Sequence, residues 1–102
     1  MAQKMTRKDV YALIDGERDY QDNLLAQGIF DGGFGGPSDA HSVGAYITML
    51  SHYVNKLQEA WTTNKGDQAA LEVMRKCAGI AVHCMEDHGA PARVDVLSKR
   101  AK

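Results

Sequence analysis

Two short clusters of polar residues, at a fixed separation, are the part of this sequence best suited to chemistry. The first is Asn55-Lys56-x-x-Glu59. After twelve intervening residues comes the second, Glu72-x-x-Arg75. Two carboxylates rarely satisfy a hard cation that prefers six oxygens, whereas Lys56 and Arg75 could contact a phosphate directly. We therefore predict no metal site here. The clusters form either an anion-binding site or a set of solvated ion pairs.

Apolar residues recur at helical spacing in three segments, which predicts an all-α fold. The first helix is expected at about 7–26, with Thr6 as its N-cap. The second is expected at about 42–63, with Ser42 as its cap, and the third at about 67–88. No segment shows the alternation of a strand.

The three helices predict one domain over residues 1–102, with an N-terminal helix followed by a long antiparallel helical hairpin. A loop at 28–41, which holds five of the ten glycines, separates the first helix from the hairpin. The tail at 89–102 follows the last helix. A chain this short buries a limited core, so we expect a homo-oligomer to complete the fold.

The hairpin gives the two polar clusters a geometric relationship. If the turn is centred near residue 65, residues whose numbers add to about 131 lie level with each other. Glu59 is then level with Glu72, and Lys56 with Arg75. On a helical wheel these side chains lie away from the apolar stripe, which is also typical of exposed ion pairs that contribute little to stability.

The spacing of the clusters resembles E-E-x-x-E … E-x-x-D, the metal signature of the MazG-like all-α nucleotide pyrophosphohydrolases. In that family the acids hold Mg²⁺ and the metal holds the triphosphate. Only Glu59 and Glu72 keep their acid here, and Asn55, Lys56 and Arg75 occupy the other positions. The resemblance implies either a divergent pyrophosphohydrolase or a nucleotide site rebuilt without metal.

A second resemblance covers most of the chain. The stretches IDGERDYQD, HSVGAYITMLSHYVNKLQEAW and RKCAGIAVHCMEDHGAP resemble a family of small uncharacterised proteins from tailed bacteriophages. This implies a viral protein acting in the host cytoplasm. Small oligomeric helical phage proteins include sponges that sequester the nucleotide signals of bacterial immunity. By analogy, we expect a role in immune evasion.

Composition narrows the classes of partner. The 102 residues carry a net charge of −1 with a pI near 6.4, which argues against a DNA- or RNA-binding protein. No stretch is long and apolar enough to cross a membrane, and the N-terminal MAQKMTRKD lacks the apolar core of a signal peptide. We therefore expect a cytoplasmic protein with no membrane partner.

Five further residues could contribute to a ligand site. Glu17 and Gln21 fall on the apolar stripe of the first helix, where buried polar groups need partners or line a pocket. Arg18 can fork onto a phosphate and Tyr20 can stack on a base. His41 precedes the second helix, whose N-terminus has free N–H groups suited to an anion.

The leading hypothesis is a protein that binds a nucleotide-type ligand without turnover, with no catalytic residue, metal ion or cofactor. One alternative is the divergent pyrophosphohydrolase, and another is a helical interaction or virion-associated protein. The ligand-binding residues predicted first are Arg18, Tyr20, His41, Lys56 and Arg75, followed by Glu17, Gln21, Glu59 and Glu72.

Overall fold

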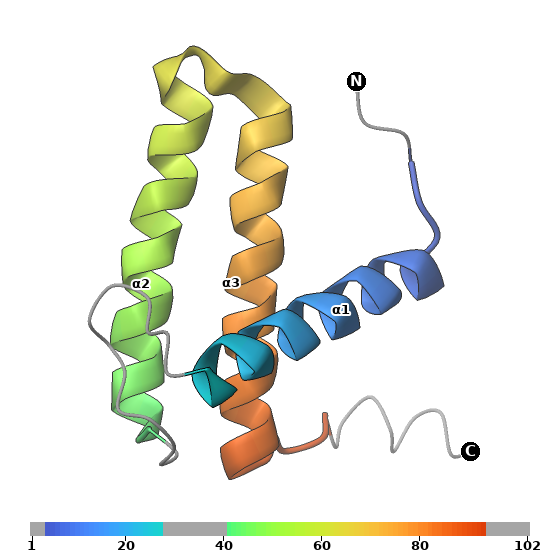
Figure 1. The fold of residues 1–102 in the computed structure, drawn as a ribbon, viewed down its shortest axis with the longest axis vertical. Helices are drawn as coiled ribbons and strands as arrows, with labels where there is room; N and C mark the ends of the chain where they lie inside the picture. The colour runs from blue at the N-terminus through green and yellow to red at the C-terminus, as the bar shows by residue number, and fades with distance from the viewer. Residues whose placement is uncertain (1–3, 28–40, 94–102) are drawn as a thin grey trace.

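Three helices and no strand make up the residues that the computed structural model describes, 4–27 and 41–93 (Figure 1). Their bounds are Arg7–Ala26 for α1, Val43–Ala60 for α2 and Gly66–His88 for α3, with a π-helical turn at Trp61–Lys65 between α2 and α3. The predicted all-α fold is confirmed. Residues 28–40 of the predicted loop at 28–41, and 94–102 of the predicted tail at 89–102, lie outside the described residues.

Side-chain caps fix the start of two helices. Thr6 Oγ1 accepts a hydrogen bond from the Asp9 amide at 3.1 Å, and Ser42 Oγ accepts one from the Ala45 amide at 3.1 Å. Each bond satisfies an amide that has no partner within the helix. As predicted, α1 therefore begins after Thr6. At the hairpin turn Gly66 has φ 72° and ψ −160°, a conformation that only glycine adopts readily.

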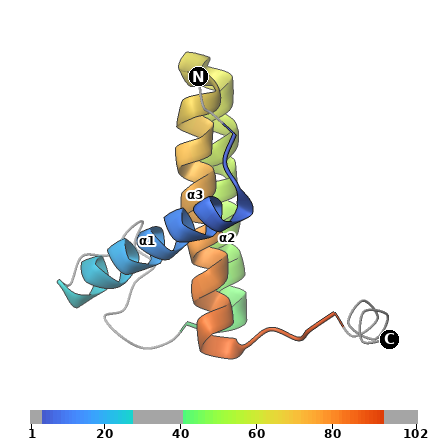
Figure 2. The same cartoon turned by 90° about the vertical axis from the view of Figure 1, so that its right-hand side faces the viewer.

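The helices α2 and α3 pack side by side and antiparallel as a hairpin, as both views show (Figures 1 and 2). At one end of the hairpin, the Tyr46 hydroxyl donates to Asp87. At the other end, Trp61 Nε1 donates to Asp67 Oδ1 at 3.1 Å. The residue numbers of these pairs add to 133 and 128, on either side of the predicted 131. The hairpin therefore has the register expected from the sequence.

The hydrophobic core lies between α2 and α3 and is small. It is built from Tyr46, Tyr53 and Ile80 with partly buried neighbours, among them the free cysteines Cys77 and Cys84. Among the described residues, no side chain has less than 2 % of its surface exposed. One buried polar atom, the Tyr53 hydroxyl oxygen, has no hydrogen-bond partner. The hairpin alone thus provides only a thin core.

The helix α1 crosses α3 and contacts no other helix in the described ranges. The crossing point is the buried Gly79, where an added Cβ would lie 2.8 Å from Gln21 Nε2 and 2.9 Å from Glu17 Cγ. Absence of a side chain at this position lets the two helices approach. Taken over the described residues, none of the helices combines the length and apolar character that a membrane span requires.

The docking face of α1 is polar, contrary to the usual expectation for an amphipathic helix. Its two buried residues are Glu17 and Arg18, each only 6 % exposed, whereas Leu13 is 46 % exposed. The apolar Leu13 therefore stays half exposed, and burial of apolar residues is not what docks α1 on α3. Electrostatic contacts, described next, hold the helix in place.

Candidate functional site

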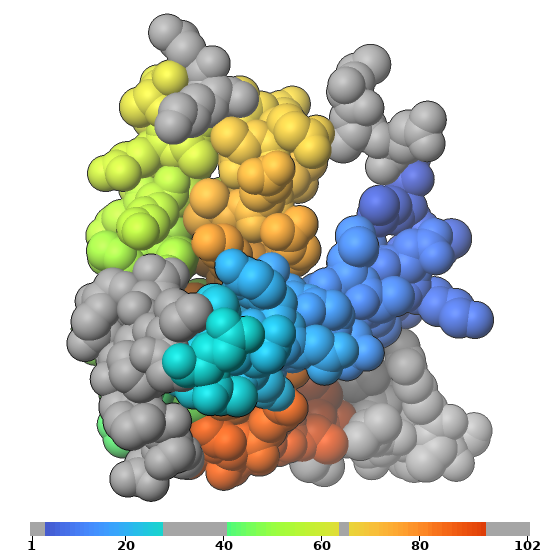
Figure 3. Space-filling model, viewed as in Figure 1, coloured from blue at the N-terminus to red at the C-terminus, as the bar shows by residue number. Residues whose placement is uncertain are grey.

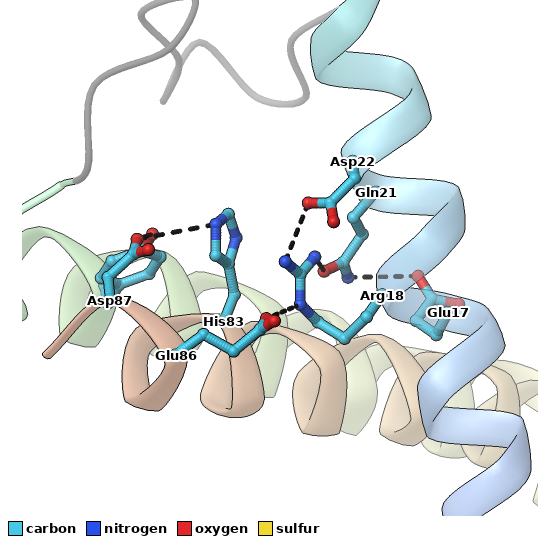
Figure 4. A network of polar contacts seen from close by, with 8 residues as sticks. Glu17, Arg18, Gln21, Asp22, His83, Glu86 and Asp87 are labelled. Carbon is cyan, nitrogen blue, oxygen red and sulfur yellow. Dashed lines mark hydrogen bonds and ion pairs between the residues drawn. The ribbon is translucent and has the colours of Figure 1, made fainter. Parts of the chain in front are cut away.

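Arg18 is the centre of a polar network that joins α1 to α3 (Figure 4). Its Nε donates to Glu86 Oε1 at 2.5 Å, and its Nη2 donates to Asp22 Oδ1 at 2.8 Å. A third bond runs from Nη1 to Gln21 Oε1 at 3.2 Å. Burial tends to lower the pKa of Arg18, but its bonds to the two carboxylates outweigh that effect and raise the pKa. The guanidinium, although predicted to contact a ligand, is thus occupied by its own chain.

Glu17 connects this network to the middle of α3. Its Oε1 accepts from Arg75 Nε at 3.0 Å, and its Oε2 accepts from Gln21 Nε2 at 3.2 Å. The Glu17 side chain is 5 % exposed, whereas that of Arg75 is 42 % exposed. A buried carboxylate needs such partners, because an unpaired charge in the interior is costly. Arg75 compensates Glu17 while its outer edge remains open to solvent.

An open hollow lies beside this ion pair, in the angle between α1 and α3 (Figure 3). Its volume is about 420 Å³. We call it the α1–α3 hollow, and its lining residues are Ala12, Leu13, Gly16, Glu17, Tyr20, Arg75 and Lys76. Two of the residues first predicted to bind a ligand, Tyr20 and Arg75, therefore meet here although 55 positions separate them.

The α1–α3 hollow combines two cations with an exposed aromatic ring. Arg75 donates to Glu17 through Nε alone, and no described residue accepts from its two terminal nitrogens or from the Lys76 ammonium. Glu17 offsets one of the two positive charges. Tyr20, 55 % exposed, supplies an aromatic ring, and the aliphatic Leu13 lines the hollow from the same helix. Such a set can hold an anion that carries a flat ring.

Other predicted ligand residues lie outside the hollow. Lys56 is exposed on α2, with its Nζ 5.1 Å from the centre of the Tyr53 ring. Glu59 and Glu72 are also exposed. Arg75 pairs with Glu17 of α1 and not with Glu72 of its own helix. The two sequence clusters therefore do not form one site among the described contacts.

His41 belongs to a separate cluster at the open end of the hairpin. Its ring lies edge-on to Tyr46 at 5.5 Å, and its carbonyl accepts from His88 Nε2 at 2.7 Å. Asp87 accepts from Tyr46 and lies 3.6 Å from His83 Nε2. His83 is part of this cluster and is partly buried. Its side chain is only 21 % exposed, because it packs against Tyr46.

Burial shapes the charge states of this cluster. Burial, followed by the hydrogen bond to Asp87, raises the pKa of Tyr46, so the phenol is the proton donor to Asp87. Burial and the nearby charge of Arg18 lower the pKa of His83. The cluster is therefore a set of mutually satisfied groups that closes one end of the hairpin.

Two residues of the network and the hollow, Glu86 and Lys76, were not predicted from the sequence. Glu86 meets Arg18 from 68 positions away, and Lys76 enters the hollow only because α1 crosses α3 at Gly79. A glycine in the middle of a predicted helix was the available signal, since glycine there costs about 1 kcal/mol relative to alanine and often marks close packing.

Within residues 4–27 and 41–93, no three His, Cys, Asp or Glu side chains are grouped so that they could hold a metal ion. Comparison with known proteins adds no relative from which a function could be transferred. No protein-family model, curated protein or solved structure matches this chain.

Proposed function

We propose that this protein binds a nucleotide-type ligand in the α1–α3 hollow and releases it unchanged. The observation that carries the proposal is the placement of Arg75 and Lys76 beside the exposed ring of Tyr20. An anionic phosphate and a flat base are the two features that these side chains suit.

The orientation of Arg75 supports the first half of this proposal. Glu17, itself held by Gln21, accepts from Nε and so fixes the plane of the guanidinium. The remaining edge of that plane presents paired N–H donors, the geometry that suits two phosphate oxygens. Lys76 adds a second cation next to it, so the hollow keeps a net positive charge although the whole chain has a charge of −1.

The α1 side of the hollow supports the second half. Tyr20 and Leu13 are about half exposed and line the same wall, so a base stacked there would cover apolar surface. Stacking of a base on an aromatic side chain contributes about 1–3 kcal/mol. None of the described residues that line the hollow is Ser, Thr, Cys or His, so binding without turnover fits this lining better than nucleophilic chemistry does.

The resemblance to phage proteins suggests which ligands to test first. A viral protein that binds a nucleotide without changing it would act by sequestration, in the host cytoplasm. The nucleotide signals of bacterial immunity, namely cyclic dinucleotides and ADP-ribose derivatives, are therefore the first probes, with nucleoside triphosphates as a third class.

Isothermal titration calorimetry of the full chain with these three classes tests the proposal. With the ligand that binds, Lys76→Ala and Tyr20→Ala should each weaken affinity about tenfold, as expected for one charge-assisted contact or one stacked base. The matched controls are Lys56→Ala and Tyr11→Ala, since Lys56 and the 63 % exposed Tyr11 lie outside the hollow. Binding that is lost equally in the controls would contradict this site.

Two further outcomes would overturn the proposed function. Absence of heat with all three classes would exclude nucleotide binding at useful affinity. Mg²⁺-dependent release of pyrophosphate from a nucleoside triphosphate, lost in Glu59→Gln or Glu72→Gln, would instead identify a divergent pyrophosphohydrolase.

A further inference from the structure

An apolar stripe runs along α2 beside its core-facing side. Its members recur at alternating intervals of four and three residues, the spacing that forms a continuous seam along a helix. Several are large and exposed in the single chain, with Ile47 61 % and Trp61 60 % exposed. The stripe consists of Val43, Ile47, Leu50, Val54, Leu57 and Trp61.

A second apolar stripe with the same spacing runs along α3. Leu71, Met74 and Met85 are each nearly half exposed, although they are large hydrophobic residues. Small residues occupy the middle of the stripe. Its members are Leu71, Met74, Ala78, Ala81 and Met85, and none of them is charged.

Helical geometry places the two stripes on the same side of the hairpin. At about 100° per residue, each stripe is displaced by roughly a quarter to a third of a turn from the side that carries the core residues Tyr53 and Ile80. The sense of rotation is the same on both helices. Because the helices are antiparallel, equal senses of rotation bring both stripes to one face, which we call the hairpin face.

The helix α1 leaves the hairpin face uncovered. Gly79, where α1 docks, is rotated from the core side in the opposite sense. No described residue of α1 contacts α2. Within residues 4–27 and 41–93, the face therefore lies open between two helices whose shared core has no side chain that is less than 2 % exposed.

The extent of the hairpin face matches what an interface between two proteins needs. Seven of its large apolar residues are about half exposed. At roughly 200 Å² for each such side chain when fully exposed, they present about 700 Å². Exposed apolar patches above a few hundred Å² are typical of interaction sites, and a standard interface buries about 800 Å² on each partner.

We propose that the hairpin face binds the same face of a second copy of this chain, which completes a four-helix bundle. A two-fold axis parallel to the helices would place α2 of each copy beside α3 of the other. All four neighbouring pairs would then be antiparallel, the arrangement of an up-down-up-down bundle. The proposal is independent of ligand binding, because the α1–α3 hollow lies outside the hairpin face.

Side-chain sizes along the two stripes favour a second copy over an unrelated partner. Rotation about this axis does not shift residues along the helices. A residue of α2 in one copy therefore lies level with a residue of α3 in the other copy when their numbers add to about 131. Leu50 of one copy is then level with Ala81 of the other, and Val54 is close to Ala78. Large residues thus face small ones, and helices can pack closely. Ile47 lies nearly level with Met85, so the ends of the small segment are closed by large pairs.

Analytical ultracentrifugation of the full chain tests this assembly. Wild-type protein at about 100 µM should sediment with twice the 11.2 kDa mass of one chain. Ile47→Glu should halve that mass and weaken dimer affinity at least about a hundredfold, because each dimer would bury two unpaired carboxylates, one from each copy. The control is Tyr11→Glu on α1, equally exposed but outside the face, which should remain dimeric. Far-UV circular dichroism should show unchanged helix content in both.

Mixing two variants tests the pairing itself. Met85→Lys alone should also be monomeric, for the same reason as Ile47→Glu. In an equimolar mixture, one chain of each kind would form one Glu–Lys pair and one unaltered Ile47–Met85 contact, so the dimeric mass should return. This rescue distinguishes loss of the interface from loss of folding.

Three results would overturn the proposal. The first is a wild-type chain that remains monomeric, which would assign the hairpin face to a different protein. The second is an Ile47→Glu variant that remains dimeric. The third is a mixture of the two charged variants that stays monomeric.

Discussion

Replacement of Gly79 by alanine should destabilise the protein, although alanine is the better helix former. Gly79 lies in the middle of α3, where α1 crosses. A Cβ at this position would lie 2.8 Å from Gln21 Nε2 and 2.9 Å from Glu17 Cγ. Gln21 has a mobile end that could withdraw, but doing so would break its bond to Glu17. The Glu17 Cγ has less freedom, because the carboxylate beyond it is held by Arg75.

The expected size follows from three opposing terms. Alanine in a helix interior is more favourable than glycine by about 1 kcal/mol. Overpacking costs about 1–3 kcal/mol, and loss of a part-buried hydrogen bond costs about 1 kcal/mol. We therefore expect Gly79→Ala to lower the free energy of unfolding by about 1–3 kcal/mol.

Urea denaturation, followed by circular dichroism at one protein concentration, measures this change. The matched control is Gly16→Ala in α1, where an added Cβ meets no atom within 4 Å and should raise stability by about 0.5–1 kcal/mol. In Gly79→Ala, removal of the Gln21 side chain by Gln21→Ala should recover part of the loss. The reasoning is refuted if Gly79→Ala stabilises the protein as much as Gly16→Ala does.

Three further predictions concern other buried polar groups. Tyr53→Phe removes a buried hydroxyl without a partner and should raise the free energy of unfolding by up to about 1 kcal/mol. Tyr46→Phe loses the bond to Asp87 and should lower the free energy of unfolding by about 1–2 kcal/mol. Urea denaturation of both variants measures these changes, and equal effects would contradict the expected difference. Because burial lowers the pKa of His83 below 6.5, the unfolded chain binds its proton more readily, and stability should fall as pH drops through 6.5 towards the folded-state pKa. In His83→Asn the free energy of unfolding should depend less on pH in this range. An unchanged dependence on pH would show that His83 is not the group responsible. Arg18→Lys should lower the free energy of unfolding by about 1–2 kcal/mol, because an ammonium cannot replace the three hydrogen bonds of the planar guanidinium. An unchanged melting temperature would show that these bonds are not needed for stability.

The helices were predictable because their signals are local. Thr6 and Ser42 cap the helices they precede, and apolar residues recur at helical spacing in the three segments that form helices. The position of the turn then determined the hairpin register. Each of these inferences uses residues that are neighbours in sequence or on one helix, so no long-range contact had to be known.

The placement of α1 was not predictable in the same way. Its apolar stripe favoured burial of Leu13, but the helix docks through Glu17 and Arg18 instead. Their partners, Arg75 and Glu86, lie 58 and 68 positions away. Spacing along a sequence cannot reveal which distant charge will meet a buried one. The sequence therefore could not show that Lys56 lies outside the site that contains Arg75.

The polar docking of α1 means that the two parts of the molecule should respond to salt in opposite ways. The carboxylates of Asp22 and Glu86, which hold Arg18, are about half exposed, so added ions can screen them. The α2–α3 core, in contrast, is apolar, and salts such as sulfate strengthen apolar burial. A rise in ionic strength would therefore loosen the first helix while it tightens the hairpin. Unfolding would then cease to be one cooperative step, and a single midpoint would no longer describe the whole chain.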